Sequence, residues 1–449
     1  MKILLINPMN SGYYYRLGAV YPPLGLSYIS SVLKNAGNLV RLIDMNVERF
    51  DWKNFNYSDF DIVGISADTV RYPLAKQISL TAKMQGVVTV LGGPHATAEY
   101  GEILKERICD YVILGEGEYT FLKLVEALQR NEKYPLLSGL SYLKDNMVVI
   151  NPLRLIENLD QLPFPDRENA RLYKTKFDGK LATSLITSRG CPFDCEFCSA
   201  SQFMGRKIRK RSVENVIEEL KQVERLGYNS VIFFDDNFTI DKTRTIELCE
   251  QMMRKNLSFS WWAFSRADEL LGKEDLLEAM SKSGCKMLFI GFESAEDDIL
   301  KEYNKKLSSS IAFEVAKLLK KYKIDLFASF IMGALNDTKE SIMKTIKMAR
   351  KLGAQIVQFS ILTPYPGTRL YEKLRAKINL KDLSLFDGTN LVFEHPEFSK
   401  KELKKLFVRA YYSVYTTPKL IFTRGIPFLI KLLTTREKPT ELQIDHQKA

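Results

Sequence analysis

The sequence predicts an α/β protein with an N-terminal doubly wound, Rossmann-like domain, a partial (β/α)6 barrel and a helical C-terminal extension. Short apolar runs alternate with helix-length segments over the first 130 residues, and the alternation returns from residue 181 to about residue 390. The chain has 449 residues, enough for two or three domains. We expect the first domain at 1–135, a linker at 136–180, the barrel at 181–390 and the extension at 391–449.

The N-terminal part contains five short apolar runs that we interpret as buried parallel strands. They are Lys2–Ile6, Leu39–Ile43, Asp61–Ser66, Val87–Leu91 and Tyr111–Leu114, with helices near Leu24–Lys34, Leu74–Met84 and Phe121–Leu128. Glycines follow the last two strands, where a parallel sheet binds ligands and backbone must approach them closely. No G-x-G-x-x-G opens a helix after the first strand, which disfavours a dinucleotide site.

The stretch from residue 131 to 180 is punctuated by prolines and is expected to connect the two parts. A short hairpin is predicted within it, from Leu140–Leu143 and Met147–Ile150. Six further strands follow, at Leu181–Ser188, Ser230–Phe234, Ser258–Ser265, Met287–Phe292, Leu326–Met332 and Ile356–Leu362, with helices between them. Six such units predict an open barrel with its chemistry at the carboxyl ends of the strands.

Net charge, apolar runs and cysteine content indicate which kinds of partner and which cellular compartment to expect. The net charge is +11, from 65 Lys and Arg against 54 Asp and Glu, which favours anionic partners such as phosphates, a membrane surface or nucleic acid. Lysine-rich solvated helices explain it equally well. No motif predicts specific nucleic-acid binding. The first apolar run is too short for a secretory signal, and no run reaches 18 apolar residues. With only six cysteines, a reduced cytoplasmic setting is expected.

Three cysteines are the most informative residues. Cys191, Cys195 and Cys198 form a C-x3-C-x2-C run, whose thiolates can hold three irons of a [4Fe–4S] cluster and leave the fourth iron open. A structural zinc site would need four ligands, and a disulfide framework would need more cysteines. The other three, Cys109, Cys249 and Cys285, are isolated and are interpreted as small apolar fillers.

This run, with Phe197 before its last cysteine, resembles the signature of radical S-adenosylmethionine (SAM) enzymes. The resemblance implies a cluster whose open iron binds SAM, an electron donor such as ferredoxin or flavodoxin, and a 5′-deoxyadenosyl radical that abstracts hydrogen from a substrate. It also implies SAM contacts at the strand ends. Asp235 or Asp236 would meet the amino group, Arg266 the carboxylate, Glu293 the ribose and the backbone of Gly333 the adenine. Tyr365, in a P-Y-P-G-T turn, would line the substrate side or only brace the turn.

The N-terminal part resembles the cobalamin-binding domain often fused ahead of a radical SAM domain. Matching pieces are Pro22–Leu26, Asp61–Ser66, Leu91–Thr97 and Leu114–Glu118. The resemblance places Ser66, Thr69, Arg71, Gly92, Gly93, His95, Gly115, Glu116 and Gly117 around cobalamin. The D-x-H-x-x-G pattern that supplies a histidine to cobalt elsewhere is absent, so we expect base-off cobalamin without a histidine ligand. A degenerate domain that binds no ligand is the alternative.

The combined resemblance implies a cobalamin-dependent radical SAM methyltransferase that methylates an unactivated carbon of a lipid-like or anionic substrate. A radical SAM cyclase, oxidoreductase or C–C coupling enzyme of the same architecture is the alternative, and a non-catalytic cobalamin or iron–sulfur sensor is a third. Two apolar tail segments within Leu420–Leu433, at 420–422 and 426–433, are bordered by basic residues, so they could lie in a membrane interface or pack on the barrel. The first option would make the enzyme peripheral to the membrane.

Overall fold

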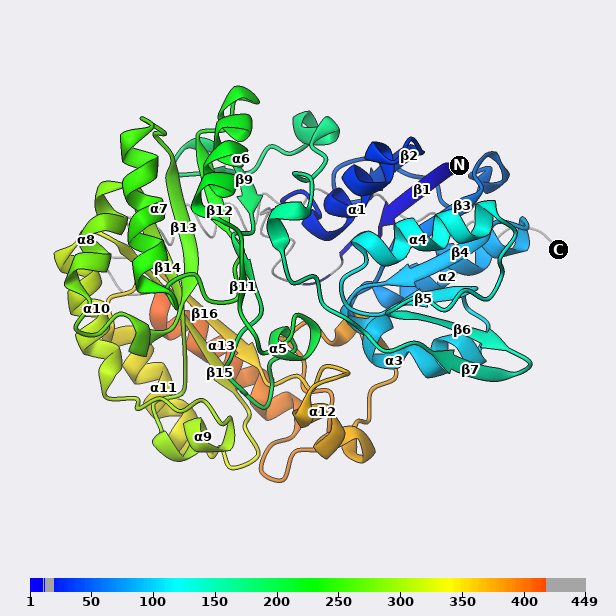
Figure 1. Cartoon of the computed structure of the whole chain (residues 1–449). Helices are drawn as coiled ribbons and strands as arrows, with labels where there is room; N and C mark the ends of the chain where they lie inside the picture. The colour runs from blue at the N-terminus through cyan, green and yellow to red at the C-terminus, as the bar shows by residue number, and fades with distance from the viewer. Residues whose placement is uncertain (11, 13–19, 417–449) are drawn as a thin grey trace.

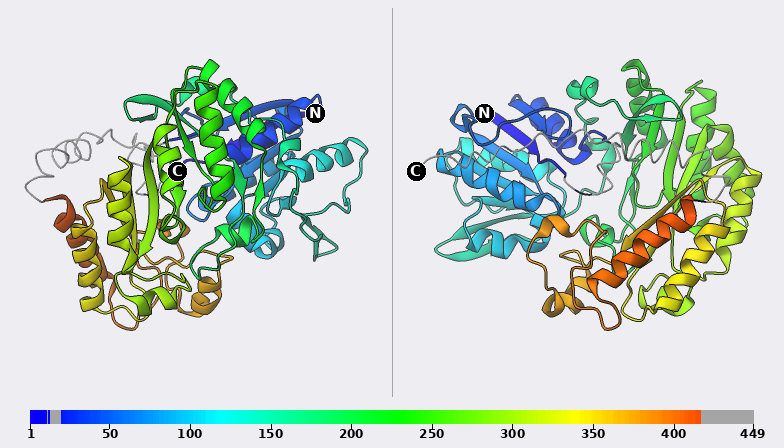
Figure 2. Two further views of the ribbon diagram at one scale, coloured as in Figure 1. Left: turned by 60° about the vertical axis from the view of Figure 1, so that its left-hand side comes forward. Right: turned by 180° about the vertical axis from the view of Figure 1, so that it is seen from behind.

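The computed structural model describes residues 1–10, 12 and 20–416, and it contains two seven-stranded sheets that lie side by side (Figure 1). The N-terminal sheet and its helices form one half of the molecule, and the second sheet with its helices forms the other (Figure 2). The predicted membrane-interface segment Leu420–Leu433 lies outside the described residues. Within those residues, no helix is both long and apolar enough to cross a membrane.

The first sheet has the strand order β2-β1-β3-β4-β5-β6-β7. Its parallel strands are β1 (Lys2–Asn7), β2 (Leu39–Asp44), β3 (Ile62–Ser66), β4 (Val88–Gly92) and β5 (Tyr111–Ile113). Alternate side chains of a strand face opposite sides. In β1, Leu4 and Ile6 join the core under α2 (Tyr72–Met84) and α3 (Pro94–Lys105), and Ile3 and Leu5 join the core under α1 (Leu24–Asn35) and α4 (Glu118–Gln129). Helices on both faces make this the predicted doubly wound domain.

The predicted hairpin exists, but it belongs to the first sheet and not to a connector. Its strands are β6 (Leu140–Lys144) and β7 (Met147–Ile150), and β6 pairs antiparallel with β5 through Tyr111 and Tyr142. The sheet therefore runs past the boundary expected at residue 135. Local sequence indicated the hairpin, but its pairing partner depends on tertiary packing.

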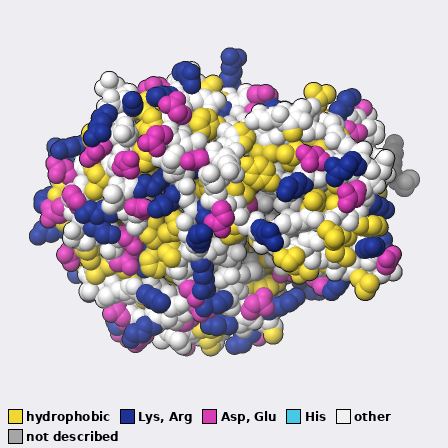
Figure 3. Space-filling view, in the orientation of Figure 1, with side chains coloured by type: hydrophobic (Ala, Val, Ile, Leu, Met, Phe, Trp, Pro, Cys, Tyr) yellow, Lys and Arg dark blue, Asp and Glu magenta, His cyan; other side chains and the backbone are white. Residues whose placement is uncertain are grey.

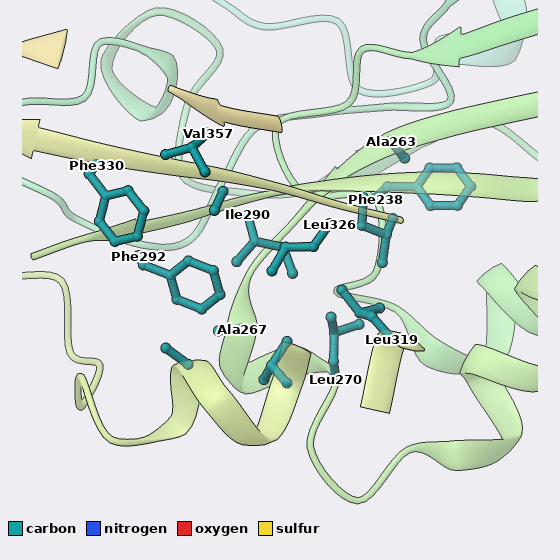
Figure 4. Packing of buried hydrophobic residues seen from close by; sticks show 14 of the residues in the cluster. Phe238, Ala263, Ala267, Leu270, Ile290, Phe292, Leu319, Leu326, Phe330 and Val357 are labelled. Atoms are coloured by element: carbon teal, nitrogen blue, oxygen red, sulfur yellow. The ribbon is translucent and has the colours of Figure 1, made fainter. Parts of the chain in front are cut away.

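The second sheet forms the half-barrel, in the order β16-β15-β14-β13-β12-β9-β8. Six strands are parallel: β9 (Lys180–Leu185), β12 (Ser230–Phe233), β13 (Ser260–Ser265), β14 (Cys285–Glu293), β15 (Asp325–Met332) and β16 (Ile356–Ile361). β8 (Lys176–Phe177) adds an antiparallel edge. The helices that cover the outer face are α6 (Val213–Arg225), α7 (Lys242–Arg254), α8 (Glu274–Lys282), α10 (Ile311–Lys321) and α11 (Lys339–Lys351). Figure 4 shows strand residues such as Ile290 and Leu326 packed with helix residues such as Leu319.

Helix α13 (Lys400–Tyr415) covers the open edge of the half-barrel. Its start carries a capping box between Ser399 and Glu402. The hydroxyls of Tyr411 and Tyr415 each donate to and accept from β16, at the backbone of Phe359 and Val357, over 2.8–3.1 Å. The free backbone groups of an edge strand are thereby paired, which protects the sheet from pairing with another chain. This is the predicted helical C-terminal extension.

Candidate cofactor sites between the two sheets

The predicted cluster loop begins directly after β10 (Ser188–Arg189). Gly190 has φ +95°, and a Cβ there would lie 2.4 Å from the Lys207 carbonyl oxygen, so a side chain is excluded. The next amide, of Cys191, donates to the Gly205 carbonyl over 3.1 Å. The sequence Ser188-Arg189-Gly190-Cys191 thus turns the chain sharply and delivers the first cysteine at the end of the strand.

The three cysteine thiols of this loop are half-buried, and those of Cys191 and Cys198 feel the charge of neighbouring cysteines. Burial raises the pKa of each thiol, to about 11 for Cys198, and the charge of neighbouring thiolates raises the pKa of Cys191 and Cys198 further. A bound metal centre relieves this penalty, because it holds its thiolate ligands deprotonated. Among the described residues, no group of three or more histidine, cysteine or acidic side chains is arranged to hold a metal ion. The donor set fits a [4Fe–4S] cluster, whose ligands bind separate irons.

The structure distinguishes the two aspartates after β12. Asp235 is buried, and its carboxylate accepts bonds from the Thr187 amide and hydroxyl and from the Ser188 hydroxyl over 2.6–2.7 Å. Asp236 accepts one bond, from the Gly190 amide over 3.0 Å. Burial, followed by the charge of Asp235, raises the pKa of Asp236 to about 6. Asp235 thus braces the strand before the cluster loop, and Asp236 is the better placed of the two to meet a ligand.

Arg266 lies against the cluster loop. Its guanidinium carbon is 3.6 Å from the ring centroid of Phe193, a cation–π contact, and its nitrogens bond Asp268 and the Lys305 carbonyl over 3.0 Å. Its positive charge also lowers the pKa of the Cys195 thiol. The predicted contact with a SAM carboxylate stays a prediction.

Glu293 occupies a strained position at the end of β14. Its φ of +66° lies in the left-handed region, and a β-bulge in the pairing with β15 falls between Gly291 and Glu293. The buried carboxylate is 2.7 Å from the Lys305 ammonium. Glu293 also lines a cavity of about 810 Å³ on the inner side of the half-barrel, which we call the barrel cavity. Strain of this kind persists only where the surroundings enforce it.

The barrel cavity contains one more predicted residue, Tyr365, together with Ser329, Gln358 and Ser360 from β15 and β16. Gly333 directly follows β15 with φ +84°, and a Cβ there would lie 2.8 Å from Leu403 of α13. The amide of Gly333 donates to Asp337 over 2.9 Å. Its glycine identity is therefore explained by packing under α13, and the adenine contact stays a prediction.

A chain of half-buried aromatic rings crosses the inner face of the half-barrel. Trp262 contacts Phe234, Phe264 and Phe327, and Phe289 contacts Phe264 and Phe327, with ring centroids 4.7–6.4 Å apart. We call these five residues the aromatic floor. Phe289 belongs to the barrel cavity as well, so the floor and the cavity are continuous. The sequence analysis did not predict the floor. Its signal is the two-residue spacing of aromatic residues such as Trp262 and Phe264, which places them on the same face of β13 once the strand is known.

Six of the residues predicted to contact cobalamin line one apolar cleft of about 970 Å³ at the carboxyl ends of β3, β4 and β5, which we call the sheet cleft. They are Ser66, Gly92, Gly93, Gly115, Glu116 and Gly117. Arg189, Phe203 and Met204 close the cleft from the other domain. Among the described residues, the buried Glu118 Oε2 has no hydrogen-bond partner, and Glu118 also lines the cleft. An apolar cleft with one free acceptor fits a large ligand that carries amide or hydroxyl donors.

Three residues of that set lie elsewhere. Thr69 lines a neighbouring cavity, and its hydroxyl is 3.3 Å from His95 Nδ1. His95 is buried and packs against Tyr72 with ring centroids 4.2 Å apart. Burial lowers the pKa of His95 to about 4, so the ring is neutral. Arg71 forms an ion pair with Asp68 at 2.7 Å and donates to Asn7 over 2.5 Å.

The neighbouring cavity joins the two domains. It measures about 880 Å³ and is lined by residues after β3 and β4 of the first domain, by Ser199 beside Cys198, and by Tyr365 and Asp387 of the barrel domain. We call it the interdomain cavity. Tyr365 and Asp387 line both this cavity and the barrel cavity, so they stand where the two meet. Asp387 was not predicted, because nothing in its local sequence marks it.

A buried ion-pair network ties the two domains together at this place. Arg189 binds Glu116 and Glu118, each at 2.7 Å, and Arg209 of β11 (Arg209–Lys210) binds Glu116 at 2.6 Å. All four side chains are at most 6% exposed. Glu116 was predicted to contact cobalamin, but its carboxylate is occupied by these two arginines. Residues 206–211 form a basic run of the kind that usually lies on a solvated face, but Arg209 and Arg211 are buried.

Two family matches cover most of the chain. Residues 185–349 match the Radical SAM superfamily, and residues 13–125 match the B12 binding domain. The two matches correspond to the half-barrel with its cluster loop and to the doubly wound domain with its cleft. They agree with the two resemblances that the sequence motifs indicated.

Comparison with whole proteins gives the same pairing. A Pyrococcus horikoshii protein named uncharacterized methyltransferase PH0819 is 36% identical over 433 residues, which cover 94% of each chain. The anaerobic magnesium-protoporphyrin IX monomethyl ester cyclase of Rubrivivax gelatinosus is 29% identical over 90% of this chain and 75% of that protein. The fold resembles that of the radical SAM methyltransferase TsrM from Kitasatospora setae, with a TM-score of 0.71, 17% identity and coverage of 83% and 77% of the two chains.

Proposed function

Because the chain belongs to the radical SAM enzymes that carry a B12-binding domain, a family that includes methyltransferases, we propose that it transfers a methyl group from cobalamin to an unactivated carbon of a largely apolar small molecule. Family membership makes it an enzyme whose cofactors are a [4Fe–4S] cluster, SAM and cobalamin. The assignment of individual residues and the nature of the substrate are the proposal.

The interdomain cavity carries this proposal. Ser199 follows the last cluster cysteine directly, and Thr69 and Pro94 follow the strands whose ends form the sheet cleft. One cavity therefore touches both the cluster loop and the cobalamin domain. A substrate held there could meet both cofactors without moving between separate sites, which is the geometric requirement of a two-cofactor reaction.

Each part of the site has a task that its chemistry suits. Cys191, Cys195 and Cys198 would hold the cluster, and the sheet cleft would hold cobalamin, with Glu118 Oε2 accepting from one of its donors. When bound, the cluster and SAM supply a radical that abstracts hydrogen, and cobalamin supplies the methyl group. Asp236 and Glu293 would receive the amino and hydroxyl groups of SAM. Tyr365 and Asp387 would orient the substrate where the two cavities meet.

The aromatic floor supports an apolar substrate. Its five rings supply a broad apolar surface, and among the described residues the lining of the barrel cavity includes Glu293 and Asp387 but no lysine or arginine. An anionic group at the reacting end of the substrate is therefore disfavoured. The cyclase relative acts, by its name, on a magnesium-protoporphyrin ester, a large planar molecule that would suit such a surface.

The test uses reconstituted enzyme, cobalamin, reductant and SAM labelled in its methyl group, with a panel of apolar polycyclic compounds and a matched anionic panel. We expect label in an apolar product together with 5′-deoxyadenosine. Trp262→Ala should raise KM more than it lowers kcat, because the floor binds the substrate away from the reacting atoms. Label only in anionic products would contradict the apolar assignment, and 5′-deoxyadenosine without any labelled product would contradict methyl transfer.

A second candidate is ring formation or oxidation of the same kind of substrate, favoured by the similarity to the cyclase. The two candidates differ in product mass. Methyl transfer adds one labelled methyl group, whereas cyclisation or oxidation changes the substrate mass without label. The cavities accommodate either reaction, so the product analysis decides between them.

A further inference from the structure

Four exposed cations stand around the loop that carries the three cluster cysteines. Arg206 and Lys207 follow α5 (Ala200–Phe203), and Arg369 and Lys373 belong to α12 (Arg369–Leu374). Their side chains are 53%, 71%, 39% and 60% exposed. We call them the basic collar. Figure 3 shows lysine and arginine side chains gathered on this face in the region of α5 and α12.

The collar contacts the cluster loop directly. Arg206 and Arg369 both pair with Asp194, the residue before Cys195, and Arg369 also donates to the Asp194 carbonyl. The Lys373 ammonium lies 2.9 Å from the carboxylate of Glu196, the residue after Cys195. Each of these three cations thus contacts a residue that is the immediate neighbour of a cluster ligand.

The charge that this surface presents outward is positive. The carboxylates of Asp194 and Glu196 are only 21% and 13% exposed, so they lie beneath the cations that bind them. Lys207 pairs with the exposed Glu157 at 2.6 Å and is the one collar residue with an exposed carboxylate as its partner. A patch of this kind attracts a partner with an acidic surface and speeds the encounter.

We propose that the basic collar is the docking surface for a small acidic electron-carrier protein of the flavodoxin or ferredoxin class. This inference rests on the proposed function, since it assumes that Cys191, Cys195 and Cys198 hold a cluster. In the step that it serves, the reduced carrier loses one electron and the cluster gains it, and no proton or group is transferred. The collar places the carrier beside the cluster loop, where the electron must enter.

An acidic protein fits the collar better than a membrane or a nucleic acid. The other arginines of the Arg206–Arg211 run, Arg209 and Arg211, are buried in ion pairs with Glu116 and Glu219, so the run offers no extended basic stripe to a phosphate backbone. Lys210 of the run pairs with Asp241, whereas Arg206 and Lys207 lie with Arg369 and Lys373 around the cluster loop, where the electron must enter. Position and charge together therefore favour a redox partner.

The test reverses two collar charges that donate to no backbone group of the cluster loop, in Lys207→Glu/Lys373→Glu. The matched control is Lys282→Glu/Lys321→Glu, whose exposed lysines on α8 and α10 also pair with surface carboxylates. The rate at which reduced flavodoxin bleaches the cluster of the holoenzyme is followed by stopped flow at low ionic strength. We expect a fall of roughly tenfold or more for the collar variant and less than about twofold for the control.

Two further measurements separate docking from damage to the cluster. Reduced methyl viologen, a small cation, should reduce the collar variant at least as fast as the wild type. Oxidised flavodoxin should bind the wild type more tightly than the collar variant in a titration without turnover, with a difference that shrinks as salt rises.

An equal loss with viologen, or an unchanged rate with flavodoxin, would overturn the docking proposal. So would a collar reversal that weakens only the binding of an oligonucleotide or of anionic vesicles. The proposed function fails differently: viologen-reduced wild type would then make no 5′-deoxyadenosine from SAM, whatever the collar does.

Discussion

Arg189 joins the two domains through Glu116, with its guanidinium 2.7 Å from the Glu116 carboxylate inside a fully buried network. The arginine lies two residues before the first cluster cysteine, and the glutamate lies in the sheet cleft. The loop that would hold the cluster and the cleft that would hold cobalamin are therefore positioned against each other by the ion pairs of Arg189 and Arg209 with Glu116 and Glu118. Arg189 is a positioning residue for both.

We predict that Arg189→Gln destabilises the protein by roughly 3–5 kcal/mol, because it leaves two glutamates buried with one arginine between them. The denaturation midpoint and the sensitivity to limited proteolysis between the domains measure this loss. Methyl product formed per 5′-deoxyadenosine should fall as well, as the interdomain cavity loosens. Lys282→Gln, which breaks an exposed pair, should change stability by about 1 kcal/mol at most. If Arg189→Gln forms as much methyl product per 5′-deoxyadenosine as the wild type, Arg189 does not position the two domains for the reaction.

The cluster assignment predicts a sharp contrast among the six cysteines. Replacing Cys191, Cys195 and Cys198 with alanine should reduce bound iron to roughly a tenth or less and abolish 5′-deoxyadenosine formation, because no thiolate ligand is left. Cys249→Ala, at a buried position in the barrel core, should keep its iron and lose only stability. Iron analysis and product chromatography make the comparison. Iron retained by the triple variant would refute the assignment.

His95 predicts how stability changes with pH. Its pKa of about 4 in the folded protein lies below the unfolded value of 6.5, so the unfolded state binds more protons between these values. The contribution of neutral His95 to the free energy of unfolding is therefore fully present above pH 6.5. It falls by roughly 3 kcal/mol as the pH drops toward 4. Thr69, Tyr72 and Asp68 surround the ring. Of these, only the negative charge of Asp68 raises the pKa of His95 and so opposes the effect of burial.

The matching variant is His95→Asn, compared with the wild type by denaturant unfolding across that pH range. The variant should lose less stability on acidification, so the two curves should converge toward pH 4. Curves that stay parallel would show that His95 does not titrate as its burial implies. Because a buried neutral ring bonded to Thr69 is not a cobalt ligand, the visible spectrum of bound cobalamin should be the same in both proteins.

Local sequence was sufficient to locate most of the strands, and it supplies the prediction that Cys191, Cys195 and Cys198 hold the cluster. The largely apolar segment 326–332 and the strand β15 coincide within one residue, because most of its side chains are buried or half-buried. The C-x3-C-x2-C run is a local motif, and three cysteines so close in sequence must lie close in space. The positions of Gly93 and Gly115 also followed from local sequence, since both have positive φ at strand ends.

Features that depend on distant partners were not predictable in this way. Arg209 is 93 residues from Glu116, so a run of basic residues looked solvated although alternate members of it are buried. Asp235 and Asp236 are adjacent, and only the hydroxyls of Thr187 and Ser188 show which of them is used to brace the strand. The aromatic floor likewise requires four neighbouring strands to be placed before its rings meet.

The buried ion pair of Glu293 with Lys305 allows a structural role of this carboxylate to be tested separately from a role in binding SAM. Glu293→Ala should leave Lys305 buried without its partner and cost roughly 3–5 kcal/mol, partly hiding any effect on SAM. The double variant Glu293→Gln/Lys305→Met removes both charges and should recover most of that stability. If the carboxylate serves only the ion pair, the double variant should bind SAM as the wild type does. We expect instead that its SAM affinity falls about tenfold or more, measured by equilibrium binding to the reconstituted enzyme, because an amide accepts more weakly than a carboxylate from hydroxyl groups.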